Sequence, residues 1–148
     1  FPGDPLQPEI VPNGGAPRRV RGEDAVRLRN VLKEKWNFDS SFWNPLTDAS
    51  PSQVVFLNGM SDDKTQMIAD RIKERLTTPL YLLDCEEGLF EISSKDMFKG
   101  VYEGVVFDAG LDWVIYFSHH HTVTFGGDWL VAVVKDLYKE QPEVLNAW

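Results

Sequence analysis

Residues 108–135, DAGLDWVIYFSHHHTVTFGGDWLVAVVK, decide the fold of this chain. The segment predicts two strands, over 113–118 and 122–125, joined by a polar turn that carries all three histidines of the chain. Strands with so short a connection are antiparallel neighbours. Gly126-Gly127 then breaks the sheet, and we expect Asp128 to cap a helix over 129–140 with one apolar face. This strand pair and helix should form the structural centre.

Apolar periodicity upstream of this segment predicts two more helices, over 22–36 and 61–76, each with acidic residues in its first turn. Ser61 is the expected N-cap of the second helix. The expected buried stripes are Ala25, Val26, Leu28, Val31, Leu32 and Trp36 in the first helix and Met67, Ile68, Ile72 and Leu76 in the second. Short apolar runs predict strands over 54–57, 80–83, 89–92 and 103–108, with one helical turn near 94–98.

The order of these elements predicts an α+β fold, a mainly antiparallel sheet of about five to six strands packed with about three helices. Residues 1–20 contain five prolines and a Gly14-Gly15 pair, which exclude a regular helix or a central strand. We therefore expect a proline-rich N-terminal arm over 1–20 and a single domain over 21–148. A further hypothesis is that the chain is a docking domain of a longer protein.

Size and composition favour a globular protein. A chain of 148 residues with 43% hydrophobic content can bury a substantial core. It shows no apolar run long enough to cross a bilayer and nothing that resembles a signal peptide. Its single cysteine, Cys85, excludes an internal disulfide and fits a reducing compartment, so we expect a cytoplasmic protein.

Charge is unevenly distributed along the chain. The net charge is −8, but residues 1–37 hold seven basic and five acidic groups, so the remainder carries the negative charge. A strongly acidic body repels phosphate backbones, which argues against nucleic acid as a partner. It attracts basic proteins and accelerates their encounter. The alternative is that the acidity serves solubility alone.

The histidine turn is the first candidate for chemistry. On a strand, His119 and His121 would share one side, and Asp112, Asp108 or Glu103 could complete a zinc or iron site with them. No established metal motif surrounds the turn, and solvated turn histidines explain the same sequence. A small metal-dependent hydrolase centred on His119, His121 and Asp112 therefore stays as the alternative, and we expect no metal or other cofactor.

Other catalytic signals are weak. Cys85 lies among Asp84, Glu86 and Glu87, whose negative charge should raise the pKa of the thiol and disfavour a nucleophilic thiolate. No Gly-x-Ser-x-Gly elbow and no phosphate-binding loop occurs. Asp108 and Asp112 span a turn, where aspartates commonly form the turn itself.

Acidic residues and aromatic residues together suggest a protein-binding surface. Aromatic anchors in an electronegative rim suit a basic protein partner. The expected binding residues are Glu86, Glu87, Asp62, Asp63, Trp43 and Phe42, the last two in a turn-rich loop that must either fold back on the core or meet a partner.

In size, acidity and tryptophan content the chain resembles the small immunity proteins that bacteria make against secreted or contact-delivered toxins. The resemblance implies a non-enzymatic inhibitor that neutralises a basic toxin or nuclease domain. It carries over no functional residue, because no family motif is matched.

Overall fold

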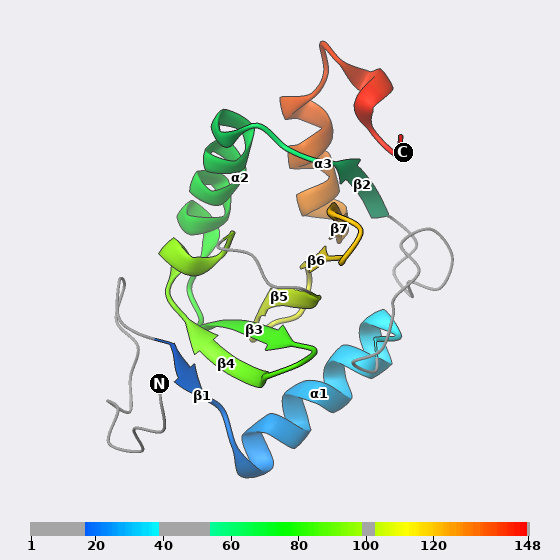
Figure 1. The fold of residues 1–148 in the computed structure, drawn as a ribbon. Helices are drawn as coiled ribbons and strands as arrows, with labels where there is room; N and C mark the ends of the chain where they lie inside the picture. The colour runs from blue at the N-terminus through cyan, green and yellow to red at the C-terminus, as the bar shows by residue number, and fades with distance from the viewer. Residues whose placement is uncertain (1–16, 39–53, 99–102, 148) are drawn as a thin grey trace.

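This computed structural model describes residues 17–38, 54–98 and 103–147. In these residues seven strands form one antiparallel sheet in the order β1-β4-β3-β5-β6-β7-β2, and three α-helices pack on it (Figure 1). The elements are β1 (Arg18–Arg19), α1 (Gly22–Trp36), β2 (Val54–Asn58), α2 (Asp62–Arg75), β3 (Leu80–Asp84), β4 (Gly88–Ile92), η1 (Ser94–Asp96), β5 (Gly104–Asp108), β6 (Val114–Phe117), β7 (Thr122–Gly126), α3 (Asp128–Leu137) and η2 (Pro142–Val144). The α+β class and the antiparallel pairing are confirmed.

The quoted segment forms two interior strands of the sheet, β6 and β7, of which β6 adjoins the middle strand β5. β6 and β7 form a hairpin in which Ile115 opposes Phe125, and both side chains are fully buried. β5 pairs with the other side of β6, and β2 with the other side of β7. The chain then leaves β7 directly into α3, whose apolar face packs on the sheet through residues such as Leu130 and Val134.

The sheet is covered on both faces, which explains the nearly continuous apolar runs of its central strands. One core cluster joins alternate strand residues, such as Val106 and Ile115, to α2 and α3. The other cluster joins the opposite set, such as Val105 and Phe107, to α1. Figure 1 shows α1 on the side of the sheet away from α2 and α3.

The buried stripes of α1 and α2 are narrower than predicted. In α1 the buried residues Leu28, Leu32 and Trp36 recur every fourth position, whereas Val26 lies off that stripe and is 59% exposed. In α2 only Ile68 and Ile72 are buried. Ala25, Val31 and Leu76 are partly buried and pack beside these rows, so the prediction was wrong only for Val26 and for Met67, which is 47% exposed.

The sequence predicted the N-cap residue correctly for one of the two helices for which a cap was named. The Ser61 hydroxyl accepts a hydrogen bond from the Lys64 amide at 3.3 Å, so the predicted N-cap of α2 is confirmed. At α3 the N-cap is Gly127, with φ of 107°, and Asp128 is the first helical residue. The acidic side chain still lies in the first turn, where it complements the helix dipole.

β1 is the strand that the sequence did not predict. Arg18 and Arg19 pair with Glu91 and Phe90 of β4, and this brings the strand count to seven. The side chain of Arg18 also forms a 2.5 Å ion pair with Glu91. A two-residue strand next to a proline-rich segment has no apolar alternation to reveal it, and proline is tolerated only at such sheet edges. No helix in the described part of the chain has the length and apolarity to cross a membrane.

Candidate functional site

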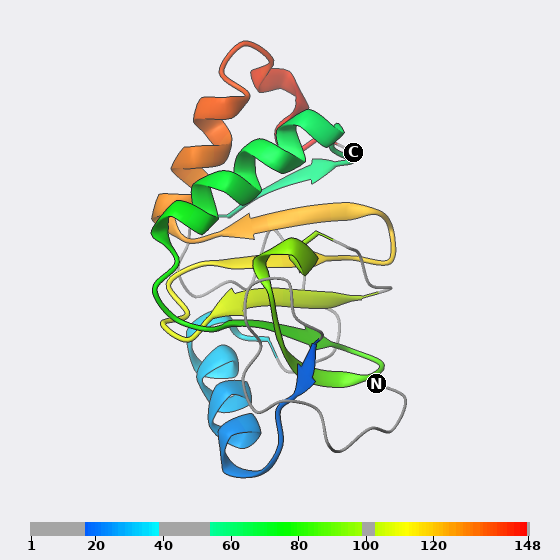
Figure 2. The ribbon, with the colours of Figure 1, turned by 90° about the vertical axis from the view of Figure 1, so that its left-hand side faces the viewer.

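Four of the predicted binding residues lie at one end of the sheet. The strand registers place five strand ends side by side at this end of the sheet. They are Asn58 of β2, Thr122 of β7, Phe117 of β6, Gly104 of β5 and Asp84 of β3. The start of α2, the β6–β7 turn and the β3–β4 turn all project from it, along the right-hand side of Figure 2. We name Asp62, Asp63, Asp84, Glu86 and Glu87 the acidic rim.

The β3–β4 turn presents Glu86 and Glu87 to solvent. The Asp84 carboxylate accepts hydrogen bonds from the Glu86 amide at 2.9 Å and the Glu87 amide at 3.2 Å. This turn holds the backbone, so both glutamate side chains point outward and are exposed. Arg19 donates to the carbonyl oxygen of Glu87 at 2.6 Å and covers the Phe90 ring at 4.8 Å.

The other half of the rim is the start of α2. Asp62 and Asp63 are exposed in the first helical turn, where their charges stabilise the helix N-terminus. Four strand spacings separate β2 from β3 in the sheet, which places the two halves roughly 19 Å apart. That span matches the width of a protein contact and is too wide for a single metal ion.

A groove opens beside this half of the rim. Its volume is about 450 Å³, and it lies between the end of β2, the start of α2 and the C-terminal segment. The groove has room for a side chain of a partner. Its lining residues are Leu57, Asn58, Gly59, Met60, Ser61, Lys64, Tyr138, Gln141, Glu143, Val144 and Ala147.

The two aromatic binding candidates cannot be placed. Phe42 and Trp43 fall in 39–53, outside the described residues. Phe38, which comes just before this range, is buried and lies edge-on to Tyr116 with ring centroids 5.9 Å apart. Phe38 therefore packs in the core and is not available to a partner.

Between the two halves of the rim lies the histidine turn, which we define as Ser118–His121. The Ser118 amide donates to the Thr122 carbonyl oxygen at 3.0 Å, and the two hydroxyls are 2.8 Å apart. The His121 amide donates to the Ser118 carbonyl oxygen at 3.1 Å, and His121 adopts a left-handed φ of 67°. His120 and His121 are exposed.

Glu103 anchors this turn from below. Glu103 is only 4% exposed, and its carboxylate accepts hydrogen bonds from the Tyr116 hydroxyl and the His119 amide. The same carboxylate lies 2.5 Å from Nδ1 of His119, whose side chain is 22% exposed. A buried carboxylate requires such donors, since an unpaired buried charge is costly.

The sequence patterns indicated Glu103 only as a candidate metal ligand and did not reveal that it anchors the turn. The signal that could have found it is strand alternation. Glu103, Val105 and Phe107 share one face of the strand, and the last two are buried, so a glutamate in the same row needs a partner. The ring of His119 lies against that of His120, with centroids 4.0 Å apart. The histidines form a turn rather than part of a strand, so the strand alternation behind the predicted pairing of His119 with His121 does not apply.

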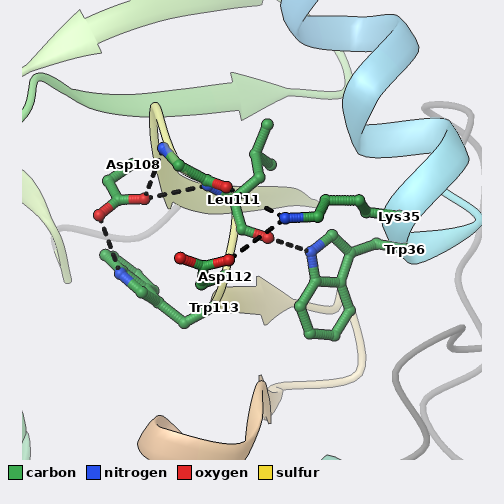
Figure 3. A network of polar contacts seen from close by, with 7 residues as sticks. Lys35, Trp36, Asp108, Leu111, Asp112 and Trp113 are labelled. Carbon is green, nitrogen blue, oxygen red and sulfur yellow. Dashed lines mark hydrogen bonds and ion pairs between the residues drawn. The ribbon is translucent and has the colours of Figure 1, made fainter.

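The structure does not bring together the residues of the predicted metal site, His119, His121 and Asp112. Asp112 precedes β6 and His119 follows it, so they lie at opposite ends of that strand. Asp112 instead pairs with Lys35 of α1 at 3.2 Å, in the network of Figure 3. Among the residues that the structure describes, no group of three or more His, Cys, Asp or Glu side chains is arranged to hold a metal ion.

Asp108 is a turn-forming residue, as expected. Its Oδ1 accepts from the amides of Gly110 at 3.0 Å and Leu111 at 3.1 Å, and its Oδ2 accepts from the Trp113 indole at 3.2 Å. Figure 3 shows these contacts at the β5–β6 turn. The two aspartates therefore have different structural partners.

Cys85 has a suppressed thiolate. Burial raises the pKa of its thiol to about 11, and the charges of Glu103 and Asp84 add to the shift, with Arg29 opposing them. The predicted direction is confirmed, although desolvation is the leading cause rather than the neighbouring carboxylates. A thiol of this pKa is a poor nucleophile near neutral pH.

Comparison with known proteins adds no family to this description. No protein-family model, curated protein or solved structure matches this chain.

Proposed function

We propose that this chain is a non-enzymatic protein-binding module that engages a basic protein through the acidic rim. We propose further that the partner is a toxin or nuclease domain, which the chain neutralises in the manner of an immunity-type inhibitor. The observation that carries the proposal is the gathering of Asp62, Asp63, Glu86 and Glu87 at one end of the sheet.

The electrostatics of the rim support a basic partner. The ion pairs of Arg18, Arg27, Lys35, Arg71 and Lys139 go to carboxylates that lie outside the rim. Arg19 and Lys64, beside the rim, donate hydrogen bonds to the carbonyl oxygens of Glu87 and Leu137. The rim therefore keeps a negative potential that would steer a cationic surface and discriminate against acidic proteins.

The rigidity of the rim also supports binding. The Asp84 turn, the Ser61 cap and the Glu103 anchor each fix an exposed segment by hydrogen bonds to its backbone. A surface that is ordered before binding loses less conformational entropy in the complex. An inhibitor benefits because more of its contact energy appears as affinity.

A matched pair of charge reversals tests the proposal. The rim variant is Glu86→Lys/Glu87→Lys, and the control is Glu34→Lys/Glu74→Lys, which changes the net charge equally at exposed positions near the opposite end of the sheet. Each protein is immobilised and exposed to a lysate of the source organism, and the retained proteins are identified. We expect the native chain and the control to retain a basic protein that the rim variant loses.

Association kinetics with that protein then complete the test. The association rate should fall steeply as salt rises, because exposed charges are screened beyond about 10 Å at 0.1 M ionic strength. The chain should also block the activity of its partner at equimolar concentration. The proposal fails if no basic protein distinguishes the rim variant from the control, or if association does not depend on salt.

A further inference from the structure

We infer that the histidine turn makes binding at the acidic rim acid-labile, so that a basic partner held at neutral pH is released as the histidines gain protons. This inference rests on the proposed function, because it concerns regulation of the same surface. It concerns a concentrated set of titratable groups that the proposed interface does not otherwise use.

The placement of the histidines carries the inference. All three histidines of the chain lie in the turn between β6 and β7. In the strand order this turn stands between β2, which leads into Asp62 and Asp63, and β3, which leads into Glu86 and Glu87. Positive charge added at the turn therefore lies between the two acidic halves of the rim. It would repel a cationic surface that is bound to both halves.

The groups around the turn fix the sign of the effect. Beside the turn these include Glu103, just before β5, Tyr116 of β6, and Cys85, just after β3, whose amide donates to the Glu103 carbonyl oxygen. Arg19 and Arg29 lie at the β3–β4 turn. Along the rim the groups include Asp62, Asp63 and Lys64 of α2, and Asp84, Glu86 and Glu87 of the β3–β4 turn. Of these side-chain types, only imidazole ordinarily changes charge between pH 8 and 5.

Protonation should leave the turn in place. Nδ1 of His119 donates to the Glu103 carboxylate whether the ring is neutral or cationic, so the anchor persists in both states. The hydrogen bonds that Ser118 makes with Thr122 and with the amides of His120 and His121 use groups that do not titrate. The change is therefore one of charge rather than of conformation, and full protonation moves the net charge from −8 to −5.

A polycationic probe makes the inference testable before any partner is known. A fluorescent oligolysine peptide keeps its charge across this range, so a change in affinity with pH reports on the protein. From the usual strength of exposed ion pairs, we expect affinity to fall roughly tenfold between about pH 7.5 and pH 5.5. Binding is measured by fluorescence anisotropy at constant ionic strength.

The matched variant is His120→Gln/His121→Asn. It removes two of the titrating groups but leaves His119 and its Glu103 anchor unchanged, and asparagine tolerates the left-handed backbone at position 121. Circular dichroism at both pH values checks that each protein stays folded. Should the double variant unfold, His120→Gln alone serves, since position 120 is exposed with ordinary backbone angles.

The outcomes separate this inference from the proposed function. A variant that binds the probe at pH 7.5 and loses clearly less affinity at pH 5.5 than the native protein supports the inference. A variant that loses as much affinity as the native protein overturns it and leaves the acidic rim standing as a binding surface. Absence of probe binding by the native chain at pH 7.5 contradicts the proposed function, and the inference falls with it.

Discussion

The indole N–H of Trp36 donates a 2.9 Å hydrogen bond to the carbonyl oxygen of Leu111, across 75 residues of sequence. Trp36 is the last residue of α1, and Leu111 lies in the β5–β6 turn with a left-handed φ of 55°. Both residues are 1% exposed. This buried bond fastens α1 to the end of the sheet opposite the acidic rim and satisfies a carbonyl that the strained turn leaves unpaired.

The Gly126-Gly127 pair should be intolerant of any side chain. A Cβ at position 126 would lie 2.6 Å from the ring of Trp36, and one at position 127 would lie 2.4 Å from the backbone oxygen of Asp112. A ring can shift more easily than backbone, and Gly127 also has φ of 107°. We expect Gly126→Ala to cost about 2 kcal/mol and Gly127→Ala roughly 3 kcal/mol or more, measured by urea unfolding.

Gly59 provides the control for this pair. It also has a positive φ, of 93°, but a Cβ there would meet nothing within 4 Å. Gly59→Ala should therefore cost only the backbone strain, and less than Gly127→Ala. Equal losses at the two positions would contradict the close packing around Gly127.

Asp108 should stabilise the fold far more than Asp112. Replacing Asp108 with alanine removes the acceptor of two turn amides and of the Trp113 indole, and we expect a loss of about 2 kcal/mol in unfolding free energy. Asp112 is 70% exposed and makes a surface ion pair with Lys35, so Asp112→Ala should cost less than about 1 kcal/mol. A larger loss for Asp112 than for Asp108 would contradict these assignments.

The sequence predicted those helices and strands that have a regular local pattern of apolar residues. Strand alternation and helix spacing identified all three α-helices and six strands within a few residues, because each buries apolar residues at a regular period. β1 was missed because Arg18 and Arg19 form a strand through pairing and an ion pair rather than through apolar burial. Val26 was misassigned because helix periodicity does not reveal how wide the contact with the sheet is.

The candidate site was less predictable because it depends on strand order. Nothing in the sequence states that β2 pairs with β7, and this pairing alone puts the start of α2 at the same sheet end as the β3–β4 turn. The same order separates Asp112 from His119 along β6. The contact of Glu103 with His119 likewise requires β5 and β6 to be neighbours.

Glu103 should be a stabilising residue whose removal loosens the histidine turn. Glu103→Ala leaves the Tyr116 hydroxyl and the His119 amide without their acceptor, and we expect a loss of roughly 3 kcal/mol in unfolding free energy. Glu103→Gln keeps one acceptor oxygen and should lose less. Amide hydrogen exchange at His119 should speed up in the alanine variant.

The exposed Glu86 is the control for Glu103. Glu86→Ala should change stability by no more than about 0.5 kcal/mol, since its side chain lies on the surface. If Glu103→Ala is equally mild, the buried network does not stabilise the fold as described.

Cys85 should react slowly with alkylating reagents in the folded protein. Its thiol pKa is raised from 9.0 to about 11 by burial, then by Glu103 and Asp84, so about a hundredfold less thiolate forms at pH 8. A more basic thiolate is a better nucleophile, which recovers part of the difference and leaves a net slowing of about tenfold. The measurement is the iodoacetamide rate of native and urea-unfolded protein as a function of pH.

The same shift gives stability a defined dependence on alkaline pH. Below pH 9 the thiol is protonated in both states, so Cys85 contributes no pH dependence. Between pH 9 and about 11 the unfolded thiol loses its proton while the folded thiol keeps it, and stability must fall as pH rises. Cys85→Ser removes this titration, so the difference in unfolding free energy between the native and serine proteins should shrink across that window. A constant difference, together with an alkylation pKa near 9 in the folded state, would show that the thiol is not buried as described.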